Sequence, residues 1–153
     1  MNTEEKQFET CQKEGCIFCK FAKKEIDTAI IFENEYVIAF PDINPAGILL
    51  GHTLVVPKKH FSTIDEVEEE YIKETMLVVK NLAKAIKKIS NADGINILQN
   101  NGKAAGQLIP HVHFHIIPRK HGDGIFFNEN RRKLHPMEQT ETAKLIKEAL
   151  QKQ

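Results

Sequence analysis

Residues 110–119, PHVHFHIIPR, alternate histidine with apolar side chains over six consecutive positions. In an extended strand neighbouring side chains point to opposite faces, so this alternation separates three imidazoles from three apolar side chains. Such a strand suits a sheet that packs one face against a core and leaves the other face open. The stretch therefore predicts a half-buried strand with His111, His113 and His115 on one face and Val112, Phe114 and Ile116 on the other.

A row of three imidazoles limits the chemistry of that face. Its outer members lie roughly 13 Å apart along a strand, so one ion cannot bind all three, although two neighbours can share one. A rigid row suits an extended anion better. The preceding loop, NNGKAAGQ, carries Gly102 and Gly106, whose flexible backbone lets N–H groups point at a phosphate. Isolated histidines on a strand are usually surface residues, but three in register beside this loop favour a functional site.

The remaining pattern predicts an α+β fold with a mainly antiparallel sheet. Ser62 and the acidic residues at 65–70 are typical of a helix N-terminus. Apolar residues then recur every three or four positions, which predicts one long amphipathic helix from there to about Ser90. Further strands are predicted within 29–40, with a turn near Asn34, at 52–57 and at 94–100, with a short helix in 17–26 and a C-terminal helix through 143–150.

One domain accounts for the length of 153 residues. Residues 1–13 are expected to form a flexible tail, and 14–153 a single domain with a C-terminal extension from about 120. The irregular part of that extension, to about Pro136, is longer than most connections, which favours a functional flap or a poorly ordered segment.

Charge and cysteine content give no support for a nucleic-acid partner, a membrane partner or a disulfide framework. The chain has 21 basic and 21 acidic residues, so composition gives no reason to expect nucleic acid or membrane as a partner. No apolar run is long enough to cross a bilayer, and the polar N-terminus does not resemble a signal peptide. Three cysteines, an odd number, argue against a disulfide framework and favour a cytoplasmic location.

The stretch GQLIPHVHFHIIPR strongly resembles the signature of the histidine triad (HIT) superfamily. The resemblance continues through IFCKFAKKEI, AFPDINP, GHTLVVPKKH and QNNGKAAGQ, and so covers residues 16–119. It implies a HIT-like fold, a homodimer, and a nucleotide hydrolase or transferase acting at the α-phosphate of a purine nucleotide such as an AMP derivative. Two branches stay open: Hint proteins, which split nucleoside phosphoramidates, and Fhit proteins, which split dinucleoside polyphosphates.

The same resemblance implies roles for individual residues. His113 would attack the α-phosphorus and form a nucleotidyl-histidine, and His115 would contact the phosphate and the leaving group. An imidazole is largely neutral near pH 7, which suits a nucleophile. The family also implies phosphate contacts from Asn100, Gly106 and Gln107, ribose contacts from Asp42, and a base pocket lined by Ile17, Phe18, Phe21, Phe40 and Ile43.

Alternatives stay open for these assignments. Each apolar residue of the base pocket fits an ordinary core equally well, and Asp42 fits a local turn. Leu108 stands where family members commonly carry Ser or Thr, which removes a hydroxyl expected near the phosphate. This departure leaves room for a nucleotide-binding sensor with little turnover. A metal-dependent hydrolase that uses the histidine row is a further alternative.

Cys16 and Cys19 form a C-x-x-C pair. A redox pair would need a βαβ context that the sequence lacks, and two inert buried cysteines are also possible. The HIT resemblance implies structural zinc held by these two cysteines with His60 and His111. A set of four protein ligands is a closed, structural site. Because such a site would use His111, the other two histidines, His113 and His115, would remain to bind phosphate.

Overall fold

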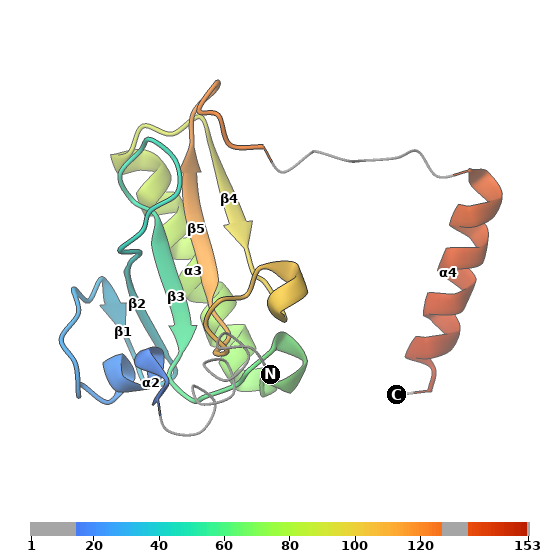
Figure 1. Cartoon of the computed structure of the whole chain (residues 1–153), viewed down its shortest axis with the longest axis horizontal. Coiled ribbons are helices and arrows are strands. Elements are labelled where there is room, and N and C mark those ends of the chain that lie inside the picture. Colours follow the sequence, from blue (N-terminus) through green and yellow to red (C-terminus); the bar gives the residue numbers. More distant parts are fainter. Residues whose placement is uncertain (1–14, 127–134, 153) are drawn as a thin grey trace.

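The computed structural model describes residues 15–126 and 135–152. It contains one five-stranded sheet in the order β1-β2-β3-β5-β4, with every neighbouring pair antiparallel. This confirms the predicted α+β class with an antiparallel sheet (Figure 1). The strands are β1 (Phe32–Glu33), β2 (Val37–Pro41), β3 (Thr53–Pro57), β4 (Gly94–Leu98) and β5 (Phe114–Arg119).

Helices cover both faces of this sheet. The long helix α3 (Glu69–Ile89) buries Val78, Val79 and Ile86 against one face, where they meet Val55 and other strand residues. The short helix α2 (Ile17–Ala22) packs on the opposite face with Phe18. Along β3 the side chains alternate between these two apolar clusters, so the central strands are buried on both sides. The histidine face therefore shares its side of the sheet with α2.

The predicted long helix begins later than expected. Residues near Ser62 form a separate 3-10 turn, η2 (Ile64–Glu66), in which the Ser62 N–H donates to Glu66. Val67 then adopts an extended conformation, with φ −71° and ψ 124°, and α3 starts at Glu69. Ser62 therefore does not cap the long helix, and the N-cap residues of both η2 and α3, Thr63 and Glu68, make no side-chain capping bond.

The histidine stretch is only partly a strand, which corrects the prediction of one continuous row. Strand β5 begins at Phe114, so of the three histidines only His115 lies within it. The N–H of His111 donates to Ile109 in a tight turn, and the N–H of Val112 donates to Phe61. The alternation survives nevertheless, because Val112 and Phe114 still pack into the α3 cluster.

Three further predictions concern the two ends of the chain. The C-terminal helix is confirmed as α4 (Pro136–Leu150), which Figure 1 shows standing clear of the sheet. The predicted tail at 1–13, with Cys11, lies outside the described residues, as does the 127–134 part of the extension. No helix in the described ranges is long and apolar enough to cross a membrane.

Candidate active site

His113 is held in the form that a nucleophile requires. Its Nδ1 lies 2.7 Å from the backbone carbonyl of His111, which accepts a hydrogen bond and so keeps the proton on that nitrogen. The other ring nitrogen, Nε2, then carries a free lone pair. Burial lowers the pKa of His113, and Phe18 packs its ring edge-on at 5.2 Å. The imidazole is therefore neutral at physiological pH and needs no separate base.

His115 receives a hydrogen bond from a histidine that the sequence did not single out for function. The N–H of Ala46 donates to Nδ1 of His52 at 2.7 Å, so His52 carries its own proton on Nε2. That Nε2 lies 2.9 Å from Nδ1 of His115 and 3.4 Å from the carboxylate of Asp42. His115 accepts at Nδ1, which leaves its Nε2 proton free to donate.

His52 is buried and forms hydrogen bonds at both ring nitrogens. One of its partners is a histidine of the triad. The pairing arises because β3 and β5 are neighbours, with Leu54 opposite His115. A single sequence does not show which strands pair, so it held no signal for this contact.

Asp42, His52 and His115 also bring three potential metal ligands within 4.8 Å of one another. A metal at Nε2 of His52 would move the proton of this ring to Nδ1. There it would face the N–H of Ala46, and two donors would confront each other at 2.7 Å. The group therefore suits a hydrogen-bonded relay and not a metal ion. This geometry disfavours the metal-dependent hydrolase considered from the sequence.

We expect His115 to make the protein sensitive to acid. Burial, followed by the charges of His113 and His52, lowers the pKa of His115 from 6.5 to about 4. Because the folded-state pKa is depressed, the stabilising contribution is complete above the unfolded pKa and is lost as the pH falls through about 4. Such a shift is worth at most roughly 3 kcal/mol. Urea unfolding of His115→Gln should show a smaller loss of stability than wild type between pH 7 and pH ~4.5. Identical pH dependence of the two proteins would contradict this account.

Gln107 shapes the glycine-rich loop from inside. Its side chain is 1% exposed and accepts from the N–H of Gly102 at 2.7 Å. Its amide nitrogen donates to the carbonyls of Ser62 and Ile109. The amide group of Gln107 is therefore used within the loop, and the phosphate contact of the Gly106 and Gln107 region stays a prediction.

The rest of the loop has both internal and exposed groups. The N–H of Gly106 donates to the carbonyl of Lys103, and the side-chain amide of Asn100 donates to the carbonyl of Gly106 at 3.4 Å. Leu108 follows with a side chain that is 85% exposed. Its N–H donates no hydrogen bond to any residue in the described ranges. The side chain of Asn100 and the backbone N–H of Leu108 are two donors that this loop can offer to a ligand.

The expected base pocket divides into buried and exposed members. Phe18, Phe21 and Phe40 form an aromatic cluster behind His113, with ring centroids 5.1 to 6.4 Å apart. Ile17 is 38% exposed and Ile43 89% exposed, so both are open to a ligand. Asp42 has the predicted turn contact, since Oδ1 accepts from Asn44, while Oδ2 faces the two histidines. Its contact with the ribose stays a prediction.

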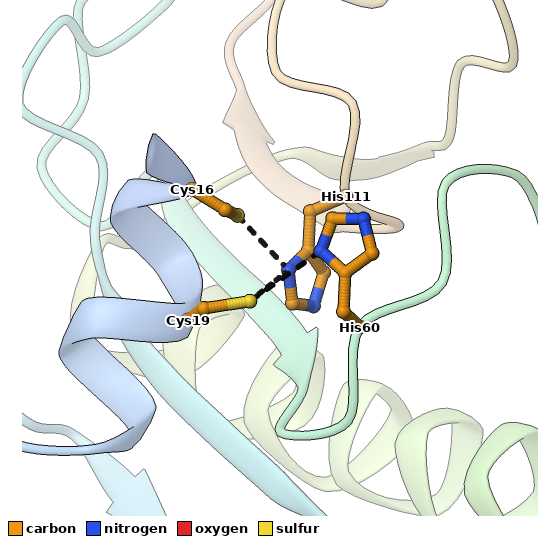
Figure 2. A group of neighbouring side chains, drawn as sticks. All are labelled: Cys16, Cys19, His60 and His111. Carbon is orange, nitrogen blue, oxygen red and sulfur yellow. Dashed lines mark hydrogen bonds between the residues drawn. The ribbon is translucent and has the colours of Figure 1, made fainter. Parts of the chain in front are cut away.

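The structure also brings Cys16, Cys19, His60 and His111 together, as Figure 2 shows. Nδ1 of His111 lies 3.3 and 3.5 Å from the two sulfurs, and Nδ1 of His60 lies 3.4 Å from Cys19. A tetrahedral zinc with sulfur and nitrogen ligands would separate them by about 3.5 Å. The Pro57 carbonyl accepts from Nε2 of His111 at 2.8 Å, which leaves Nδ1 free to bind a metal. The donor set, its spacing and the His111 tautomer all fit zinc.

Comparison with known proteins is consistent with this site. The sequence model of the HIT domain matches residues 23–122. An uncharacterized HIT-like protein of Methanocaldococcus jannaschii is 50% identical over 109 residues, which span 71% of this chain and 82% of that protein. The adenosine 5′-monophosphoramidase of Saccharomyces cerevisiae is 44% identical over 106 residues, 69% of this chain and 63% of the yeast protein.

A solved structure shows the same arrangement of elements. The zinc-bound histidine triad family protein of Mycobacterium smegmatis superimposes with a TM-score of 0.66 at 34% identity. The match covers 80% of this chain and 85% of that chain. Sequence and fold agree with the histidine geometry, and the chain belongs to the HIT family.

Proposed function

We propose that this protein is a nucleotide hydrolase or transferase that cleaves AMP-containing substrates at the α-phosphate through a nucleotidyl-histidine. The observation that carries the proposal is the tautomer of His113, whose Nδ1 proton is held by a carbonyl 2.7 Å away. Nδ1 is thus the donor, and Nε2 is left as the nucleophile. A relative named adenosine 5′-monophosphoramidase, 44% identical, supports the substrate class.

The proposed reaction has two steps. Nε2 of His113 forms a bond to the α-phosphorus while the bond from phosphorus to the leaving group breaks. The Nε2 proton of His115, which His52 keeps in place by donating to Nδ1 at 2.9 Å, forms a hydrogen bond to the leaving group, and the leaving group takes its proton from solvent. A water molecule then attacks the phosphorus, gives a proton to solvent and releases AMP and His113. The N–H of Leu108 and the amide of Asn100 would stabilise the charge on the phosphate oxygens.

Among possible leaving groups we favour an amine. The yeast relative named adenosine 5′-monophosphoramidase, 44% identical over 106 residues, supports this choice. Release of AMP from adenosine 5′-phosphoramidate and from diadenosine triphosphate tests the choice directly. We expect a larger kcat/KM for the phosphoramidate. Turnover of neither compound, with AMP still bound, would favour the sensor instead.

Leu108 is expected to limit the rate. A serine at this position would place a hydroxyl donor beside the N–H that we assign to the phosphate. A hydrogen bond to a charged group is worth about 1.5 kcal/mol or more, so Leu108→Ser should raise kcat/KM for the phosphoramidate about tenfold. Leu108→Ala is the matched control, because it shortens the side chain without adding a donor. Equal rates for the two variants would show that the hydroxyl contributes nothing.

We propose that the four-residue group in Figure 2 holds structural zinc. The ion would tie α2 to His60 and to the turn at His111 and would supply no reacting group, because all four positions belong to the protein. Thiolate ligands require reduced cysteines, which agrees with the expected cytoplasmic location. The single domain over 14–153 and the absence of nucleic acid and membrane partners remain predictions.

A homodimer also stays a proposal. Strand β4 is an edge of the sheet and exposes Ile97 at 43%. Helix α4 has Leu145, Ile146 and Leu150 more than half exposed, and an isolated helix of 15 residues is marginal in water. A second copy of the chain could cover such surfaces. Light scattering measures the molar mass in solution. We expect the mass of two chains, and a mass of one chain at micromolar concentration would exclude the dimer.

A further inference from the structure

The segment after β5 folds back on itself and is fastened by one arginine. We call residues 119–125 the strap. Nε and Nη2 of Arg119 donate to both carboxylate oxygens of Asp123, at 2.7 and 2.8 Å. Nη2 also donates to the carbonyl of Ile125 at 2.6 Å, and Nη1 donates to Asn96 on β4. The Asp123 side chain is 4% exposed, so this pair is shielded from water as surface pairs are not.

Ile125, at the end of the strap, packs against Gly47 in the loop that precedes β3. A Cβ built on Gly47 would lie 3.3 Å from Cδ1 of Ile125 and 3.6 Å from the carbonyl of Pro118. Gly47 has a φ of +82°, a conformation that side chains rarely adopt. The loop therefore turns tightly beneath Ile125.

The same loop donates a hydrogen bond to His52. Residue 46, next to Gly47, donates its N–H to Nδ1 of His52, and Nε2 of His52 reaches His115 at 2.9 Å. The Ala46 N–H is thus one of three partners of the His52 ring, beside His115 and Asp42. A continuous set of contacts runs from Arg119 through Asp123, Ile125 and the loop to the triad.

We propose that Arg119 and Asp123 are positioning residues for the reaction. By holding Ile125 on Gly47, they keep the Ala46 N–H on His52 and so fix the ring that aligns His115. The proposal rests on the proposed function for its kinetic consequence. Its structural part concerns one hydrogen bond and can be tested without turnover.

The strap has a second anchor that supplies a matched control. Lys120 pairs with Asp93 at 2.9 Å, and the N–H of His121 donates to the other oxygen of Asp93. These contacts fasten the strap to the turn before β4 and do not involve Ile125. A variant of Asp93 therefore perturbs the same segment without releasing the loop.

The experiment measures amide hydrogen exchange by NMR in the full chain, together with kcat and KM for adenosine 5′-phosphoramidate. In Asp123→Ala and Ile125→Ala we expect the Ala46 amide to exchange at least about tenfold faster, with Val55 in β3 changed less than about twofold. We expect kcat to fall about tenfold with KM nearly constant, because alignment and not binding is lost. Asp93→Asn should match wild type in all these quantities.

Three results would overturn the proposal. Unchanged Ala46 exchange in both strap variants would show that the loop holds itself. Equal acceleration at Ala46 and Val55 would show a general loss of stability instead of positioning. Selective release of Ala46 with kcat unchanged would show that the bond does not serve the reaction. Absence of turnover in wild type would refute the proposed function, while the exchange measurement would still decide whether the strap holds the loop.

Discussion

Replacement of His113 by alanine is expected to lower kcat for AMP release by at least about a thousandfold, which corresponds to roughly 4 kcal/mol of transition-state stabilisation. The variant loses the nitrogen that would bond to phosphorus, and no neighbour replaces it. His115 accepts a hydrogen bond at Nδ1 from His52, and His111 faces the two cysteines. Steady-state release of AMP from adenosine 5′-phosphoramidate provides the measurement.

Folding and binding controls make this result specific. His113 is 7% exposed and packs against Phe18, so its truncation leaves a small cavity and lowers stability without unfolding the domain. AMP should still bind, because the phosphate donors and Asp42 are unchanged. His121→Ala removes an exposed imidazole six residues beyond His115 and should retain full activity. An active His113→Ala enzyme would refute the nucleophile assignment.

Replacement of Cys16 by serine is expected to remove zinc and lower the melting temperature by about 10 °C, equivalent to several kcal/mol in a domain of this size. Helix α2, which begins directly after Cys16 and contains Cys19, has six residues and is too short to form by itself. We attribute its position to zinc and to Phe18, which packs behind His113. Metal analysis of the purified protein and thermal unfolding provide the two measurements.

Cys11→Ser is the matched control for this variant. Cys11 lies outside the described residues and outside the proposed ligand group, so its replacement should leave zinc content and melting temperature unchanged. Unchanged values in Cys16→Ser would defeat the zinc proposal. A lower melting temperature without zinc in the wild-type protein would mean that Cys16 acts through packing alone.

The periodic parts of the sequence predicted most of the fold. The alternating stretch became β5, the strands predicted within 29–40 and at 52–57 became β1, β2 and β3, and the apolar spacing between Ile72 and Ile89 became α3. These patterns record which side of an element faces the core, and burial dominates stability. The start of α3 was missed because Ser62 and Glu66 offer good capping chemistry for a turn of either kind.

The site was predicted less completely because its contacts cross the sheet. The grouping of Cys16, Cys19, His60 and His111 followed from resemblance, and the structure places them together. The link from His52 to His115 depends on the pairing of β3 with β5, which no local pattern specifies. The inward orientation of Gln107 likewise depends on Ser62, 45 residues away.

Each histidine of the triad owes its role to the partner of one ring nitrogen. Carbonyl groups hold Nε2–H of His111 and Nδ1–H of His113, so the free nitrogens face the cysteines in the first case and the reaction site in the second. His115 differs, because the N–H of His52 occupies its Nδ1 and leaves a donor at Nε2. In the proposed mechanism one sequence motif thus supplies a metal ligand, a nucleophile and a hydrogen-bond donor.

The most direct test of the proposed chemistry is intact-protein mass spectrometry after brief incubation with adenosine 5′-phosphoramidate and quenching without acid. Wild-type protein and His113→Ala are measured side by side. The account predicts an added mass equal to one adenylyl group on the wild type and none on the variant. An adduct on His113→Ala, or AMP release by the wild type with no adduct at any time during single turnover, would contradict a nucleotidyl intermediate on His113.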